Sequence, residues 1–128
     1  MITFEDFTPG SLLGERGFLL DREAVAQWTA LFPDDGESLP VMPAAMIAMV
    51  VMRAFVDILD ERPRGNIHAA QTFWVRRLPC LGERLTTRLS CLGKEFKGNR
   101  RWVTLGSETN DAAGALLFRG RMTTIWAA

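Results

Sequence analysis

The feature that most restricts the fold is a change of hydrophobic period part-way along the chain. An apolar run from Val41 to Met52 stands near the centre, and Pro43 suits the first position of a helix because its missing N–H costs nothing there. Arg53 and Asp57 lie four residues apart and add a polar stripe before residues 63–65, Pro-Arg-Gly, end the helix. We predict one helix of about 18 residues, apolar nearly all round at its start and therefore buried against a sheet.

From Asn66 onward, apolar and polar residues alternate with a period of two. After Glu83, one face of the predicted strand carries Leu85, Thr87, Leu89 and Cys91, and the other carries Arg84, Thr86, Arg88 and Ser90. Turn sequences at 98–99 and 111–114 separate the strands that follow. The pattern predicts strands over 66–77, from 83 onward, over 100–110 and over 115–126, with the later ones forming an antiparallel meander.

The first third of the chain is less regular. An extended segment over Leu12–Leu20 precedes Asp21, a good N-cap for a short amphipathic helix over residues 22–32. The stretch Phe32–Pro43, with three prolines, a glycine and two adjacent aspartates, is typical of a loop. Together these elements predict an α+β fold in which a long antiparallel sheet wraps a central buried helix, as a single domain over residues 1–128.

Composition excludes several classes of function. Fifteen basic and fifteen acidic residues cancel, so nucleic acid is not expected as a partner. The longest apolar run is too short for a membrane span and the N-terminus lacks the pattern of a signal peptide, which favours a soluble cytoplasmic protein. Cys80 and Cys91 lack the spacing of a metal site and are read as reduced thiols, so neither metal nor cofactor is expected. The long strand edges favour a homodimer or a higher homo-oligomer.

Several phrases resemble the hotdog-fold superfamily, and within it the MaoC-like hydratases and dehydratases. They are the opening FEDFTPG at 4–10, the phrase VRRLPCLGERL at 75–85, and the later Thr109-Asn110 and Gly114 before the closing strand. The resemblance spans almost the whole chain and implies the hotdog fold and an acyl thioester of coenzyme A or acyl carrier protein as ligand.

The segment from Phe32 to Pro43 is also similar to a stretch of the dehydratases that act on acyl carrier protein. That family has a catalytic His just before Phe-Pro and a Glu six residues after the last Pro of the stretch. Leu31 and Met49 stand at those two positions here. The resemblance therefore implies a site that has lost both catalytic groups.

MaoC-like enzymes use an Asp and a His five residues apart to activate water across a conjugated thioester. Asp34 or Asp35 matches the Asp, but Leu39 or Pro40 stands where the His would be, and neither transfers a proton. The family also polarises the thioester carbonyl with backbone N–H groups at the start of the central helix, a task that needs no particular side chain.

At that helix start, Ala44 and Ala45 occupy the matching positions. Asp34 and Asp35 are the candidate catalytic residues, with Glu37 as a possible second group; the alternative is a solvated loop in which Asp favours turns.

Three further sets have both a functional and a structural interpretation. Arg76 and Arg77 suit the phosphates of coenzyme A, or are solvent-facing charges. His68, the only histidine, is a strand residue unless a second copy brings it to the loop. The methionines of the central helix line an acyl tunnel or belong to the core; they are Met42, Met46, Met49 and Met52.

Three functions follow from these residues. The first is an acyl-thioester-binding protein of the MaoC-like hydratase or dehydratase type with an incomplete Asp/His pair. The second is a non-catalytic subunit that pairs with a catalytic hotdog partner in a hetero-oligomer. The third is a thioesterase in which Asp35 or Glu37 directs water.

Overall fold

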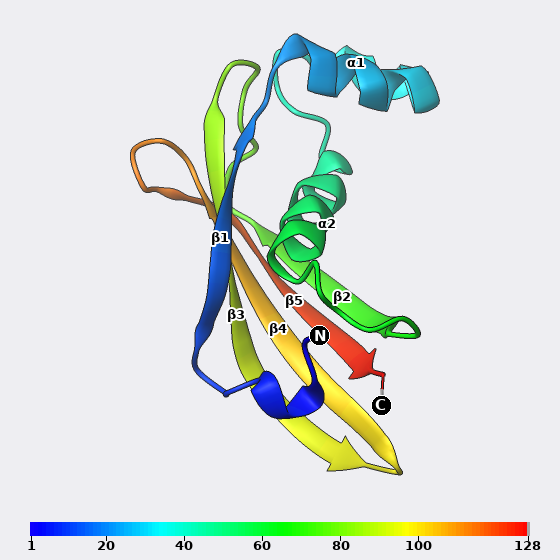
Figure 1. Ribbon diagram of the computed structural model, residues 1–128. Coiled ribbons are helices and arrows are strands. Elements are labelled where there is room, and N and C mark those ends of the chain that lie inside the picture. Colours follow the sequence, from blue (N-terminus) through cyan, green and yellow to red (C-terminus); the bar gives the residue numbers. More distant parts are fainter. Residues whose placement is uncertain (128) are drawn as a thin grey trace.

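The computed structural model describes residues 1–127 and shows a curved five-stranded antiparallel sheet with one long helix against its inner face (Figure 1). The elements in chain order are η1 (Phe4–Asp6), β1 (Leu12–Leu19), α1 (Arg22–Leu31), η2 (Pro33–Ser38), α2 (Met46–Ile58), β2 (Ile67–Val75), β3 (Arg84–Lys97), β4 (Arg100–Asn110) and β5 (Leu116–Trp126), where η marks a short 3₁₀ helix. The α+β class and the central buried helix predicted from the sequence are confirmed.

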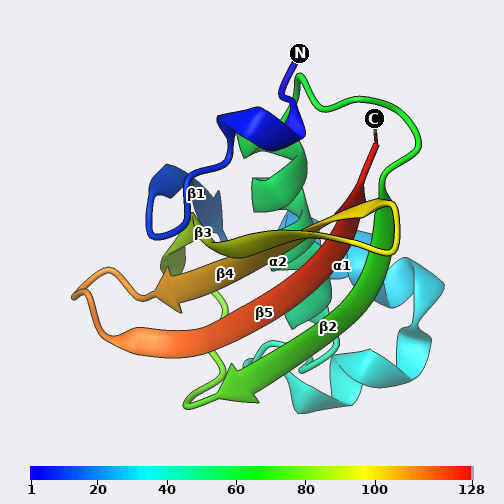
Figure 2. The ribbon, with the colours of Figure 1, turned by 90° about the horizontal axis from the view of Figure 1, so that it is seen from below.

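The helix α2 fills the concave side of the sheet, which curves around it (Figure 2). Its apolar side chains join two clusters, one toward each end of the helix. Met46, Ile47 and Val50 pack with Phe118 of β5 near the start, and Phe55 packs with Trp126 near the end. Burial of these side chains at roughly 25 cal/mol per Å² of apolar surface is the main force that holds helix and sheet together.

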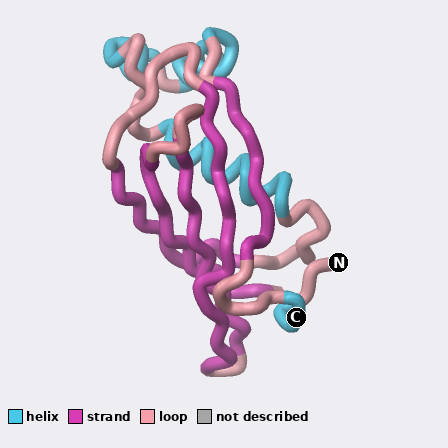
Figure 3. Tube along the Cα trace, turned by 90° about the vertical axis from the view of Figure 1, so that its left-hand side faces the viewer, coloured by secondary structure: helices cyan, strands magenta, loops and turns pink. Residues whose placement is uncertain are grey.

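The strand order is β1-β3-β4-β5-β2. The predicted meander over β3, β4 and β5 is confirmed, but β2 lies beyond β5 and does not neighbour β3, which follows it in the chain. The predicted inward face of β3 is also confirmed, because Leu85, Thr87, Leu89 and Cys91 are all buried. The long β3–β4 hairpin projects past the other strands (Figure 3). The strand order leaves β1 and β2 as the two edge strands.

Two predictions for the region before α2 were wrong. The helix begins at Met46 and not at Pro43, because residues 43–45 form a tighter turn in which the Met46 N–H donates to the Pro43 carbonyl at 3.0 Å. The stretch Phe32–Pro43 is not wholly irregular, since Pro33–Ser38 form the 3₁₀ helix η2. The predicted cap of α1 is confirmed, because the Asp21 carboxylate accepts from the Ala24 N–H at 2.8 Å.

Candidate functional site

Two backbone N–H groups just before α2 have no hydrogen-bond acceptor among the described residues. Ala44 and Ala45 are exposed, and within residues 1–127 neither amide donates to any acceptor. The amides of Met46, Ile47 and Ala48 are different, because each closes a turn onto the carbonyl three residues earlier. Free N–H groups at the positive end of a helix dipole favour an oxygen that carries or develops negative charge.

This turn is fastened to the connection between β2 and β3. The Met42 N–H donates to the Pro79 carbonyl at 2.9 Å, and the Leu81 N–H donates to the Pro40 carbonyl at 2.8 Å. Val41 and Cys80 form an isolated antiparallel bridge between these two bonds. The backbone on both sides of Ala44 and Ala45 is therefore fixed by the fold before any ligand arrives.

The two candidate carboxylates lie in η2, beside α1. Asp34 is exposed, whereas Asp35 is partly buried and accepts a hydrogen bond from the Trp28 indole N–H at 2.7 Å. Glu37 is exposed and makes no side-chain hydrogen bond within the described part of the chain. The Trp28–Asp35 bond, which orients the Asp35 carboxylate, was not predicted from the sequence.

Leu31 and Met49 line the same groove between α1 and α2. The groove has a volume of about 310 Å³, and its other lining residues are Ala24, Gln27, Trp28 and Arg53. These two positions hold the catalytic His and Glu in the carrier-protein dehydratases that the sequence resembles. The fold therefore brings the two positions together, but both side chains are apolar and cannot carry a proton.

Arg77 is tied into an ion-pair network with two carboxylates. Its guanidinium donates two hydrogen bonds to Glu83, at 2.9 and 2.8 Å, and one to Asp111 at 3.0 Å. Glu83 raises the pKa of Arg77, and Arg77 in turn holds the pKa of Glu83 below its usual range. The pKa of Asp111 is lowered mainly by the hydrogen bond from the Ala115 backbone N–H and, to a smaller extent, by the hydrogen bond from Arg77. The network fastens the β2–β3 connection to the β4–β5 turn.

Arg76 differs from its neighbour. Its backbone N–H donates to the Leu117 carbonyl at 2.8 Å, while its exposed guanidinium makes no hydrogen bond to any residue in the range 1–127. Between the two predicted phosphate-binding residues, Arg76 is the one whose charge is available to a ligand. The role of each in binding stays a prediction.

His68 lies away from the start of α2. It is exposed near the beginning of β2, and β2 reaches the connection that contacts the α2 start only after Val75. His68 pairs with Thr124 of β5 and Val75 pairs with Phe118, six positions apart, so the two residues are separated by about 20 Å along the strand. In the part of the chain that the structure describes, no three His, Cys, Asp or Glu side chains gather as a metal site would require.

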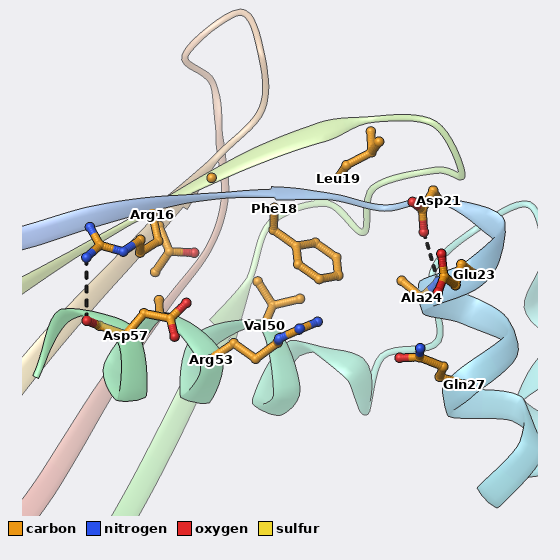
Figure 4. A pocket seen from close by; sticks show the side chains of 13 residues that line it. Arg16, Phe18, Leu19, Asp21, Glu23, Ala24, Gln27, Val50, Arg53 and Asp57 are labelled. Atoms are coloured by element: carbon orange, nitrogen blue, oxygen red, sulfur yellow. Dashed lines mark hydrogen bonds between the residues drawn. The ribbon is translucent and has the colours of Figure 1, made fainter. Parts of the chain in front are cut away.

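A polar hollow of about 390 Å³ opens between β1, α1 and the second half of α2 (Figure 4). The Arg16 guanidinium donates to the Asp57 carbonyl there at 3.4 Å, and Arg53 lies with its guanidinium 5.9 Å from the centre of the Phe18 ring. This arrangement confirms the predicted polar stripe of Arg53 and Asp57. The hollow lies beside Val50 to Asp57 and not beside the free amides, so we assign it no part in the site.

The four methionines that were assigned to the central helix belong to the core, although Met42 lies before α2. Met42 and Met46 are fully buried, and Met49 and Met52 pack against the two clusters from their margins. Met49 also lines the groove beside Leu31.

No protein-family model and no curated protein matches the chain by sequence. Solved structures match it closely in shape. The (R)-hydratase of A. caviae involved in PHA biosynthesis aligns with a TM-score of 0.77 and 15% identity over 96% of this chain and 99% of the other. The MaoC-like dehydratase of Rhodospirillum rubrum aligns with a TM-score of 0.79 and 17% identity over 100% and 99%. The chain has the hotdog fold.

A third similar structure is the HadBC complex of Mycobacterium tuberculosis, a 3R-hydroxyacyl-ACP dehydratase. It aligns with a TM-score of 0.69 and 14% identity over 86% of this chain and 90% of the other. These matches confirm the fold implied by the sequence resemblance. Among the helices of residues 1–127, none combines the length and hydropathy needed to cross a membrane.

Proposed function

We propose that this hotdog protein binds acyl thioesters of coenzyme A or acyl carrier protein at the start of α2, as a member of the MaoC-like hydratase and dehydratase type. The observation that carries the proposal is the pair of amides of the exposed residues Ala44 and Ala45, which have no acceptor among the described residues. The folds of the A. caviae (R)-hydratase and the R. rubrum MaoC-like dehydratase support the choice of ligand.

The chemistry of hydration explains why these amides matter. Water adds to the β-carbon of a conjugated thioester, and the electrons of the double bond move onto the thioester oxygen. An oxyanion forms there, so donors aimed at that oxygen stabilise the transition state more than the substrate. Held rigidly between Met42 and Met46, the two amides need little rearrangement to do so.

The proposed site lacks a complete set of proton-transfer groups. Asp34 and Asp35 are the only candidates that the sequence resemblance places there, and Asp35 is held by Trp28. Leu39 or Pro40 stands where the imidazole is expected. Leu31 and Met49 stand where the related dehydratases have their catalytic His and Glu. If the chain turns over an enoyl thioester, Asp34 or Asp35 has to act with a group from elsewhere.

A non-catalytic subunit is the second candidate function, and the apolar groove at Leu31 and Met49 favours it. The HadBC complex and the ChsH1-ChsH2 complex of M. tuberculosis show that chains with this fold occur in hetero-complexes. In such an assembly, this chain would bind or position the thioester while its partner supplies the acid and base. A thioesterase reading rests only on Asp35 and Glu37, and we rank it below the other two.

The test is a panel of enoyl-CoA substrates mixed with purified protein at high concentration, followed through loss of the conjugated-thioester absorbance. Turnover that disappears in Asp34→Asn or Asp35→Asn would support the hydratase. Binding of the same thioesters without turnover would favour the non-catalytic subunit. Release of free thiol from saturated acyl-CoA would identify a thioesterase, and the absence of both binding and turnover would refute the proposed function.

A further inference from the structure

The edge strand β2 lacks the charged residues and prolines that commonly prevent another strand from pairing, although it carries a bulge between His68 and Ala70. Edge strands commonly carry Lys, other charges or Pro that prevent the approach of another strand. β2 reads IHAAQTFWV and contains none of these, whereas the opposite edge strand β1 contains Glu15 and Arg16. Seven of the nine β2 residues are exposed, including Trp74 at 45% and Val75 at 50%. These features indicate that a second strand covers this edge.

A second copy of the same chain is the occupant that fits best. When a two-fold axis passes through the middle of a strand, that strand pairs antiparallel over its full length with the same strand of the second copy. The middle of β2 is Gln71, with Thr72 beside it. Pairing at this edge would continue the five-stranded sheet of one copy into that of the other.

The position of His68 in such a pair follows from its face and register. His68 pairs with the buried Thr124 of β5, so its side chain lies on the inner face of the sheet, the face that α2 covers. The register shift between His68 and Ala70 marks one extra residue in β2. When this residue is counted, an axis through Gln71 sets His68 opposite Phe73 of the other copy.

An axis through Thr72 instead sets His68 opposite Val75 of the other copy, which is also an inward-facing residue because it pairs with the buried Phe118. In either register the opposed Cα atoms are ~5 Å apart. Phe73 packs against the core cluster that contains Met42 and Met46, on either side of the free amides. The imidazole that lies about 20 Å from this end of β2 in its own copy would thus reach the same end in the other copy.

We propose that His68 of a second copy completes the site at the start of α2. The inference rests on the proposed function and names the group that is missing from it. The imidazole would take a proton from water as the water oxygen bonds to the β-carbon, and the double-bond electrons would move onto the thioester oxygen, held by the Ala44 and Ala45 amides. The imidazolium would then return that proton to the α-carbon as the carbonyl re-forms, so that water is added and His68 ends neutral.

Pairs of variants with two different affinity tags test this assignment, because the mixed dimer can be purified through both tags. His68→Gln lacks the imidazole, and Ala44→Pro lacks one amide donor. If the site is shared, a mixed dimer of these two variants has one intact site out of two and recovers about half of the wild-type turnover. Each variant alone should be slower by ~100-fold or more.

The matched control is a mixed dimer of wild type with the double variant His68→Gln/Ala44→Pro. If each site is shared between the two copies, both sites of this control dimer are broken and turnover is lost. If each site is built within one copy, the wild-type copy stays active. The opposite pattern, with the first mixed dimer inactive and the control half active, would overturn the role of His68 in the second copy and leave the proposed function standing. Failure of the wild type to turn over any enoyl-CoA would refute the catalytic proposal and this assignment together.

Discussion

The sharpest test of the free amides is the substitution Ala44→Pro, because it deletes one N–H and leaves the other hydrogen bonds of the turn in place. Ala44 is the second residue of a turn closed by the Met46 N–H and the Pro43 carbonyl, a position at which Pro is favoured. The Ala44 carbonyl still accepts from Ile47, at 3.1 Å. The free energy of unfolding should therefore stay the same or rise by about 0.4–1 kcal/mol.

Binding and turnover should respond very differently to this change. A single hydrogen bond to the neutral thioester carbonyl contributes about 0.5–1.5 kcal/mol, so the Kd should rise roughly 2- to 10-fold. The same donor facing the oxyanion contributes more, and its loss should lower kcat by about 100- to 1,000-fold. Calorimetric titration with a non-reacting acyl-CoA gives the first number, and decay of the enoyl absorbance gives the second.

The matched control is Ala44→Val, which keeps the N–H and adds a side chain of similar size to that of Pro. Only Ala44→Pro should lose turnover if the amide acts as a donor. Equal turnover in the two variants, whether high or low, would refute the reasoning, because it would show that the bulk at residue 44 and not its N–H determines the rate.

Three further predictions concern the surroundings of the site. Asp35→Asn keeps an acceptor for the Trp28 indole and should retain the urea midpoint while losing hydration activity, whereas Asp35→Ala should also lose about 1 kcal/mol of stability. Arg77→Gln should lower the thermal midpoint at neutral pH. Because its two carboxylate partners have lowered pKa values when folded, that difference should shrink as the pH falls below about 4, and a constant difference would contradict the ion-pair account. Gly120→Ala should cost roughly 1–3 kcal/mol in urea unfolding, since its Cβ would come within 2.9 Å of the Phe73 ring.

Local patterns in the sequence were sufficient to predict the types of the main elements. The alternation of Leu85 to Cys91 identified the inward face of β3, because a side chain on a strand faces the core at every second residue whatever its neighbours are. The apolar run after Pro43 identified the buried helix, because a helix that is apolar nearly all round has to be buried. The exact helix start was not predictable, since the turn at 43–45 depends on hydrogen bonds to residues near Pro79.

The sequence by itself also determined which chemical groups the chain possesses: a single imidazole, two adjacent aspartates, and apolar residues at Leu31 and Met49. Only the tertiary structure decided which of them meet. It placed β2 beside β5, so that His68 lies at an open edge, and it tied Arg77 to a carboxylate 34 residues away. Such contacts depend on how strands and helices pack over long separations, and packing is a property of the whole sheet that no local spacing encodes.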